Sequence, residues 1–134
     1  MCFSQPDTFP AADLHRSVIA ARCRDQWLLC RQKFSTGWIL PGAKLFEGES
    51  AEQAARRALW EMTGAMRFNL LPVSAYRVST DPDFSGILYR ANVFLRGSPP
   101  SHANIDAVYC EKNLPPGMIF PAHELLEKAA SFTP

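Results

Sequence analysis

Regular alternation of hydrophobic and polar positions predicts the strands of this chain. The clearest run is 86–96, where odd-numbered positions from 87 to 95 would share one face and even-numbered positions from 88 to 94 the other. Runs 17–23 and 27–33 are separated by Arg24-Asp25, which suits a tight turn and predicts a hairpin. Residues 66–78 read as mostly extended with Pro72 at an edge, and 105–110 as one more strand.

Two segments carry helical signals instead. Ser50 is a good N-cap, Gln53 completes a capping-box pattern, and Gly64 supplies a stop, which predicts a helix up to Thr63. Residues 121–130 predict a closing helix with proline at its first position. Its expected packing side is Leu125, Leu126, Ala129 and Ala130.

The remaining segments read as connections. Residues 1–14 are expected to be an irregular lead-in, 42–49 a loop, and 79–85, 97–101 and 114–117 turns or loops. The order of strands, helix, strands, helix predicts an α/β protein, with a mixed sheet covered by helices on both faces as an α/β/α sandwich. The length of 134 residues suits a single domain, residues 1–134.

Composition narrows the function classes. The formal net charge is +1, so no strong field attracts a nucleic-acid polymer or an anionic membrane, while a small anionic ligand needs only a local basic pocket. Four cysteines lack metal-binding spacing and read as buried free thiols. The sequence shows neither signal-peptide features nor a run long enough to span a membrane, so a soluble, cytoplasmic protein is expected.

The segment from Gly42 to Gly64 carries the most specific pattern. It opens with Pro41-Gly42-Ala43-Lys44 and continues with framework residues at fixed spacing, namely Glu49, Arg57, Leu59, Glu61 and Gly64. This spacing resembles the Nudix box, G-x5-E-x7-R-E-U-x-E-E-x-G-U, in which U is a bulky aliphatic residue. The strand hairpin before the box and the short helix at the end of the chain are also similar to the layout of many Nudix proteins.

The resemblance implies a fold and a chemistry. It implies a Nudix-like α/β/α sandwich with a loop-helix-loop box, and hydrolysis of a nucleoside diphosphate linked to another moiety with Mg²⁺ or Mn²⁺. Carried over to this chain, Glu61 and Glu49 are the candidate catalytic residues. Glu61 and the Gly42 carbonyl are the candidate metal ligands. Arg57, paired with Glu49, and the closing Gly64 are expected to be structural.

Three box positions depart from the pattern: Ala43, Ala58 and Met62. Positions 58, 61 and 62 share one helix face, where three carboxylates would converge on a hard cation that prefers oxygen ligands. Only Glu61 remains there, so we expect weak metal binding or none, and Ala43 should restrict the loop if positive φ is needed. A further acidic ligand from a later loop stays open among Asp81, Asp83, Asp106 and Glu111.

Candidate ligand-binding residues lie outside the helix. Lys44, Arg90 and Asn92 are expected to bind substrate, with Arg77 as another candidate for phosphate. Aromatic candidates for stacking on a base are Trp38, Phe46, Tyr76 and Phe84, although each could equally pack in the core.

Three hypotheses follow. The first is a Nudix-type pyrophosphohydrolase with impaired activity, and the second is a catalytically inactive nucleotide-binding or regulatory domain on the same scaffold. The third is a small α/β domain that resembles the box by chance. The expected partner is a small nucleotide-like molecule, and a homodimer stays open.

Overall fold

Strand β2 (Arg16–Cys23) organises the sheet because three strands pair with it. The computed structural model describes residues 1–113 and 117–132. The seven-stranded sheet has the order β1-β5-β6-β2-β3-β7, and β4 pairs with β2 beside this path. The pairing of β2 with β6 is parallel and the other pairings are antiparallel, so the sheet is mixed, as predicted.

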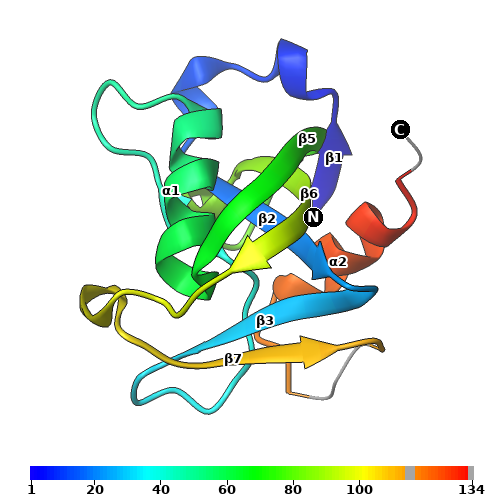
Figure 1. The fold of residues 1–134 in the computed structure, drawn as a ribbon. Coiled ribbons are helices and arrows are strands. Elements are labelled where there is room, and N and C mark those ends of the chain that lie inside the picture. Colours follow the sequence, from blue (N-terminus) through cyan, green and yellow to red (C-terminus); the bar gives the residue numbers. More distant parts are fainter. Residues whose placement is uncertain (114–116, 133–134) are drawn as a thin grey trace.

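The elements follow one another in the predicted order (Figure 1). The other strands are β1 (Cys2–Ser4), β3 (Gln26–Gln32), β4 (Gly42–Lys44), β5 (Ala65–Arg77), β6 (Gly86–Arg96) and β7 (Ile105–Glu111). The helices are α1 (Ala51–Thr63) and α2 (Ala122–Ala130). Short 3-10 turns are η1 (Pro6–Thr8), η2 (Ala11–Asp13), η3 (Pro82–Phe84) and η4 (Ser101–Ala103).

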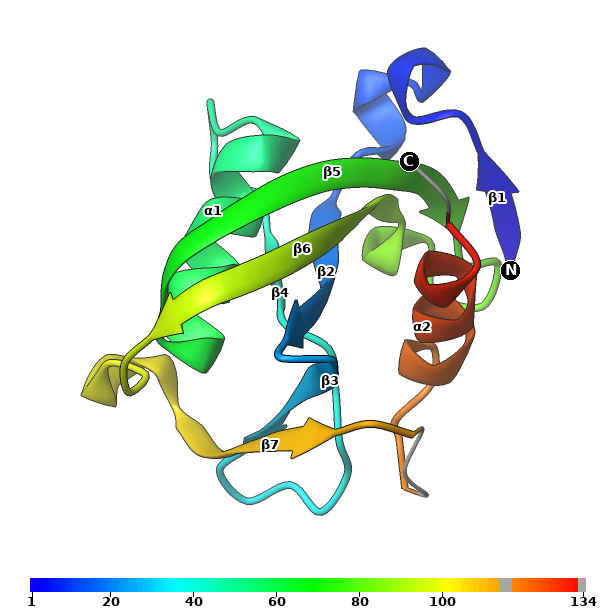
Figure 2. The same ribbon diagram turned by 45° about the vertical axis from the view of Figure 1, so that its right-hand side comes forward.

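The two helices cover opposite faces of the sheet. Figure 2 shows α1 and α2 on either side of strands β2 and β6. Alternate residues of β2 divide between two cores: Ile19 packs in the cluster that includes α1, and Val18 packs in the cluster that includes α2. The predicted α/β/α arrangement is therefore confirmed, and each face of the central strand is buried beneath one helix.

Local sequence determines how α1 begins and ends. The Ser50 side chain accepts a hydrogen bond from the Gln53 backbone N–H, and the Gln53 side chain accepts one from the Ser50 backbone N–H. Gly64 ends the helix in the left-handed conformation, with φ of 76°. The capping box and the glycine stop are both present, as predicted from the sequence.

The predicted hairpin between β2 and β3 is also confirmed. Arg24 and Asp25 form its two-residue connection, and both have positive φ, 53° and 64°. Positive φ at both central residues is the requirement of a type I′ turn, whose twist matches that of the flanking strands.

Some local predictions were wrong. The lead-in is not irregular throughout, because Cys2–Ser4 forms β1 against β5. The loop at 42–49 begins with a strand, since Gly42–Lys44 pairs with β2. Ala130 is exposed, and Ala122 takes its place on the buried side of α2. The turn predicted at 114–117 lies largely outside the described residues.

No helix within residues 1–113 and 117–132 has the length and apolar character that crossing a membrane requires.

Candidate functional site

The loop before α1 is held by one arginine. Arg57 donates from Nε to Glu49 Oε2 and from Nη2 to Glu49 Oε1, both at 2.9 Å, and Nη2 also donates to the Lys44 carbonyl at 2.9 Å. The Arg57 guanidinium lies 3.8 Å from the centre of the Phe46 ring. The hydrogen bond from Arg57 is the main reason that the pKa of Glu49 falls to about 2, so Glu49 is ionised at neutral pH. The ion pair expected between these two residues is present.

Glycine is needed where the box meets the sheet. At Gly42, a Cβ atom would lie 2.8 Å from the Ser17 carbonyl oxygen, so only glycine fits against β2. Ala43 lies in β4 and is absent from the positive-φ residues of the chain, so the restriction expected from losing glycine there does not arise. The backbone of the box is therefore compatible with this departure from the family pattern.

The helix face that should carry three carboxylates is mostly apolar. Ala58 is buried in the core beneath α1. Met62 is also buried, and its sulfur accepts a hydrogen bond from the Gly42 N–H at 3.3 Å. Glu61 is the carboxylate left on this face, and its oxygens lie 3.8 Å from Arg57 Nη1 and 3.8 Å from His102 Nε2.

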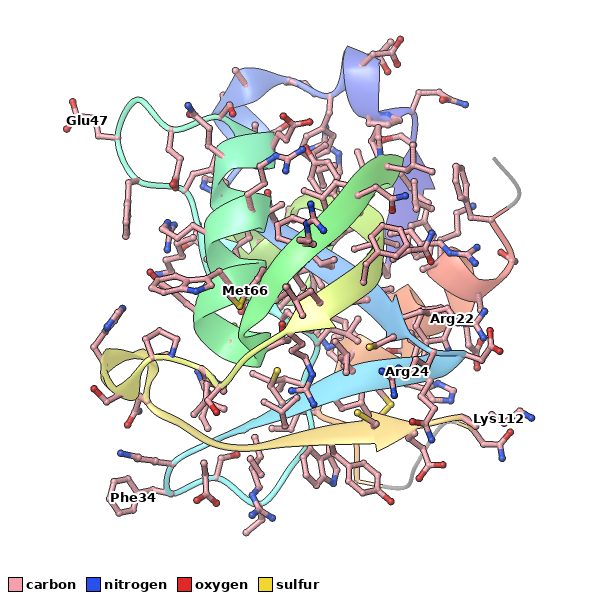
Figure 3. All side chains as sticks on the ribbon, viewed as in Figure 1. Arg22, Arg24, Phe34, Glu47, Met66 and Lys112 are labelled. Atoms are coloured by element: carbon pink, nitrogen blue, oxygen red, sulfur yellow. The ribbon has the colours of Figure 1, made fainter. Side chains whose placement is uncertain are left out.

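These donors do not fit a magnesium or manganese site. A thioether is a soft ligand, whereas Mg²⁺ requires several oxygen ligands in octahedral geometry. Glu47, in the loop before α1, does not replace them, because its side chain extends outward from that loop (Figure 3). Within residues 1–113 and 117–132, no three His, Cys, Asp or Glu side chains form a group that could hold a metal ion.

None of the four later carboxylates named as possible extra ligands is a charge partner of Glu61 among the described residues, where its partners are Arg57 and His102. Asp106 pairs with Arg31 at 2.9 Å. Glu111 accepts a hydrogen bond from the Tyr109 hydroxyl at 2.9 Å. Asp81 and Asp83 belong to the segment around η3. Asp106 and Glu111 therefore have local partners, and the charge of Asp81 acts on Arg16, which is on β2.

Beside Met62 lies a cavity of about 310 Å³, between the sheet and α2. This volume is at the lower end of the ~300–1,000 Å³ range of small-molecule sites. Its walls are largely apolar, with Val18, Leu40 and Leu125 among them. Arg16 and Gln32 add polar side chains to the wall. Gly42 of β4 and Met62 of α1 also line the cavity, so it borders the box.

Arg16 was not among the candidates from the sequence. The signal that could have identified it is its register, because Arg16 precedes Val18 and Ala20 on the strand face that packs towards α2. A charged residue at that position lies partly buried at the edge of the core. Its guanidinium stacks 4.6 Å from the centre of the Phe84 ring.

The predicted substrate-binding residues do not line this cavity. The Lys44 side chain is exposed at the end of β4. Arg90 donates to the Phe132 carbonyl at 3.0 Å, and the Asn92 backbone N–H donates to Asn69 Oδ1. Their involvement in ligand binding stays a prediction, and so does the role of Arg77, which pairs with Asp13.

The four aromatic candidates lie in different surroundings. Phe84 lines the cavity. The Tyr76 ring is buried in the core, with its centre 6.2 Å from the centre of the Phe84 ring. Trp38, in the β3–β4 connection, packs against Tyr109 with the ring centres 5.1 Å apart. Phe46 is exposed beneath Arg57. Of the four, Phe84 is therefore the one in position to contact a molecule in the cavity.

Comparison with known proteins identifies the class to which this fold and site belong. The NUDIX domain model matches residues 13–130, and the chain therefore belongs to the Nudix family. None of the curated proteins compared has a sequence matching this chain.

Three solved structures illustrate the likeness of fold. A mutant of the Bacillus subtilis pyrophosphohydrolase BsRppH is similar with a TM-score of 0.76 and 20% identity over 96% of this chain and 89% of its own. A Nudix hydrolase from Nitrosomonas europaea gives 0.67 and 17% over 88% and 89%. The NUDIX domain of Shewanella oneidensis NrtR, complexed with ADP ribose, gives 0.65 and 21% over 94% and 91%.

Proposed function

We propose that this chain binds a nucleoside diphosphate or a derivative of one, and that it has lost most of the metal-dependent hydrolysis expected from the Nudix box. The observation that carries the proposal is the contact between Met62 Sδ and the Gly42 N–H. It places a thioether and a backbone donor together where the family pattern has a carboxylate beside a carbonyl. With Ala58 buried as well, Glu61 lacks neighbouring carboxylates with which to share a divalent cation.

Two further observations support ligand binding on this scaffold. The cavity beside Met62 is largely apolar with a few polar groups, which is typical of small-molecule sites. The NrtR domain, which has a similar fold, was solved with ADP ribose bound. A nucleotide-like ligand therefore suits both the shape of this site and the class of protein.

The test measures binding and turnover separately. Titration calorimetry with ADP, IDP, CDP, UDP and ADP-ribose, in EDTA and then in Mg²⁺, should show binding of at least one nucleotide with unchanged affinity. Phosphate or nucleotide release under Mg²⁺ or Mn²⁺ should stay near the uncatalysed rate. Rapid metal-dependent release, or a tight Mg²⁺ site in the natural protein, would overturn the loss of hydrolysis. Absence of binding to every nucleotide would overturn the binding function.

A matched pair of variants examines the helix face directly. Met62→Glu adds a carboxylate next to Glu61 and should produce Mg²⁺ binding that calorimetry detects. Met66→Glu makes the same chemical change at an exposed position just beyond α1 and should not (Figure 3). If both variants bind Mg²⁺ equally, the effect is one of net charge, and the position of Met62 is not responsible.

Residual hydrolysis is the second candidate function. It is favoured by Glu61, whose side chain is 28% exposed and faces both Arg57 and His102. If turnover is detected, Glu61→Gln should abolish it and leave nucleotide affinity unchanged. Turnover that survives Glu61→Gln would exclude this carboxylate as the catalytic residue.

A further inference from the structure

A second cavity lies on the face of the sheet that α1 covers. Its volume is about 330 Å³, and its wall combines the N-terminal segment, the beginning of α1, and strands β5 and β6. Figure 2 shows the N-terminal turns, in blue, near the end of β5. Five lining residues belong to the hydrophobic cluster that includes α1 or pack against it: Phe9, Leu14, Ala51, Ile87 and Tyr89. The sheet therefore separates this α1-side cavity from the cavity beside Met62, which lies towards α2.

Tyr89 brings a polar group to this largely apolar wall. The residue is 7% exposed, so it is more than nine-tenths buried. Within the described residues, the tyrosine hydroxyl that donates a hydrogen bond is that of Tyr109, and the one that is enclosed without a partner is that of Tyr76. The Tyr89 hydroxyl therefore has no protein partner and is not sealed in the core. Because Tyr89 lines the α1-side cavity, its hydroxyl is open to a ligand there.

This hydroxyl is protonated at neutral pH. Burial is the main cause that raises the pKa of Tyr89, and the charge of Glu52 raises it further. A protonated tyrosine hydroxyl can donate one hydrogen bond and also accept. The effect of Glu52 shows in addition that a carboxylate in the first turn of α1 acts on the hydroxyl.

The charges around the α1-side cavity leave one carboxylate unpaired. Asp7, in η1, lines the cavity, and none of the ion pairs among residues 1–113 and 117–132 includes it. The neighbouring carboxylates have partners, because Glu52 lies 3.7 Å from Arg56 and Asp13 lies 2.6 Å from Arg77. The charge that remains at the cavity is therefore negative.

The positive end of the α1 dipole does not reverse this balance. The capping box of Ser50 and Gln53 occupies backbone donors at the start of the helix, and Glu52 places a carboxylate in the same turn. A cation is therefore favoured over an anion at this cavity.

Shape and charge together define the ligand. The apolar wall, which includes Leu14, Pro72 and Ile87, suits a hydrocarbon ring. A protonated amine on a short chain from that ring has three N–H donors. It can donate both to the Asp7 carboxylate and to the Tyr89 hydroxyl oxygen, since both residues line the same small cavity.

We propose that the α1-side cavity binds small arylalkylamines, with the ring against the apolar wall and the ammonium group facing Asp7 and the Tyr89 hydroxyl. The site lies on the other face of the sheet from the proposed nucleotide site. The two cavities share no lining residue. The inference therefore goes beyond the proposed function and holds whether or not a nucleotide binds.

Three ligands with the same ring and different charge test the proposal: phenethylamine, phenethyl alcohol and phenylacetate. In an NMR titration of the isotope-labelled protein near neutral pH, the amine should shift the amide signals of Phe9, Ala51 and Ile87. At low ionic strength it should bind about fivefold more tightly than the alcohol, as expected for an exposed charge pair, and phenylacetate should bind most weakly. About 1 M NaCl should bring the affinities of the amine and the alcohol together, because salt screens the charge.

Matched variants assign the affinity to its residues. Asp7→Asn should remove the preference for the amine and keep the binding of the alcohol. Asp83→Asn is the control, because Asp83 is also the second residue of a 3-10 turn that begins with proline, and it does not line the cavity. Tyr89→Phe keeps the packed ring and should weaken binding of the amine about two- to tenfold, whereas Tyr109→Phe removes a hydroxyl elsewhere and should not.

The NMR spectra decide whether the cavity is a site. If none of the three ligands shifts the signals of Phe9, Ala51 and Ile87, the proposal is overturned. Shifts confined to the other cavity, at residues such as Leu40 and Leu125, overturn it as well.

The affinities decide the ligand class and the residues. Equal binding of the three ligands, or tightest binding of phenylacetate, overturns the preference for an amine. A preference that survives unchanged in Asp7→Asn overturns the role of Asp7, and an affinity unchanged in Tyr89→Phe overturns that of Tyr89. If Tyr89→Phe does not fold, Asp7→Asn and the three ligands still decide between an amine site and none. Each of these results leaves the outcome of the nucleotide titrations untouched.

Discussion

At the scale of single residues, the Arg57–Glu49 contact joins the helix to the loop before it and lowers the pKa of Glu49. Two parallel hydrogen bonds join the guanidinium to both oxygens of the carboxylate, and Phe46 covers the pair from one side. Bidentate pairs of this kind add geometric specificity to their charge attraction. The loop between β4 and α1 is therefore fixed by an interaction that depends on the ionisation of Glu49.

This dependence predicts how stability changes with pH. The pKa of Glu49 is lowered to about 2, so the pair stabilises the fold above the unfolded-state pKa of about 4.3. That contribution should decline as pH falls from about 4.3 towards 2. Glu49→Gln should cost about 1–3 kcal/mol at pH 7, and the difference from the natural protein should shrink at pH 3. Urea unfolding at the two pH values measures it.

Glu47→Gln is the matched control for this prediction. It removes a carboxylate from the same loop, two residues earlier, where the side chain extends outward (Figure 3). Its effect on stability should be within about 0.5 kcal/mol at both pH values. A Glu49→Gln difference that is as large at pH 3 as at pH 7 would contradict the ionic origin of the stabilisation.

The residue types within the box could be interpreted from the sequence, but the contacts that residues make across the fold could not. Helical spacing alone indicated that Ala58 and Met62 leave Glu61 without carboxylate neighbours. The position of the Met62 sulfur against Gly42 depends on the approach of β4 to α1, which spacing does not specify. Arg16 was missed because its environment is created by β6 and η3, which are distant in the sequence.

At the scale of elements, α1 is stabilised by signals at both ends. Ser50→Ala removes the side-chain acceptor for the Gln53 N–H and should lower the free energy of unfolding by about 1 kcal/mol. Chemical denaturation would measure the loss as a lower midpoint, with the dependence of the unfolding free energy on denaturant concentration unchanged. Ser98→Ala, in the exposed loop after β6, makes the same substitution without a cap and should have little effect. Equal losses in the two variants would show that the cap contributes nothing.

Two effects make glycine necessary at the C-terminal end of α1: the backbone strain of a positive φ and a steric collision of any side chain. Gly48 and Gly64 have almost the same positive φ, 77° and 76°, but a Cβ at Gly48 meets open space while one at Gly64 collides with the Gly97 carbonyl. Gly48→Ala should cost about 1–2 kcal/mol from backbone strain alone. Gly64→Ala should cost clearly more, because the connection after β6 must also move.

Thermal or urea unfolding of the two alanine variants compares these costs directly. Similar losses would contradict the collision at Gly64, and a negligible loss in both would contradict the role of positive φ.

Elements with local signals were predicted well, and those that depend on distant partners were not. The hairpin, α1 and β6 follow from turn residues, caps and alternation within each segment. By contrast, β1 and β4 are only three residues long and exist because β5 and β2 offer edges to pair with. Short strands of this kind carry no periodicity of their own, since three residues cannot establish a pattern.

At the scale of the whole molecule, the central sheet protects its interior thiol from the solvent. Cys30 lies on β3, is fully buried, and donates to the Met62 carbonyl at 3.4 Å. Burial raises the pKa of Cys30 to about 12, so almost no thiolate is present near neutral pH. The exposed Cys2 has no such protection.

Thiol labelling should therefore report global unfolding. Near pH 8, Cys2 should react rapidly, while Cys30 should react at a rate that rises with urea in parallel with unfolding. Mass spectrometry of labelled peptides distinguishes the two sites, and Cys2→Ser should remove only the fast reaction. Equal rates at Cys2 and Cys30 in native buffer would show that the sheet opens locally around β3.

The cavity beside Met62 also links a bound ligand to the amount of folded protein. Its lining residues come from β2, α1 and α2, among other elements, and the parallel pairing of β2 with β6 joins distant parts of the chain, so the cavity exists only after the long-range sheet has formed. A ligand held there binds the native state and not the unfolded chain. At about 100 times its dissociation constant it would add about 2.7 kcal/mol to stability. The lifetime of this protein under proteolysis would then follow the concentration of such a ligand.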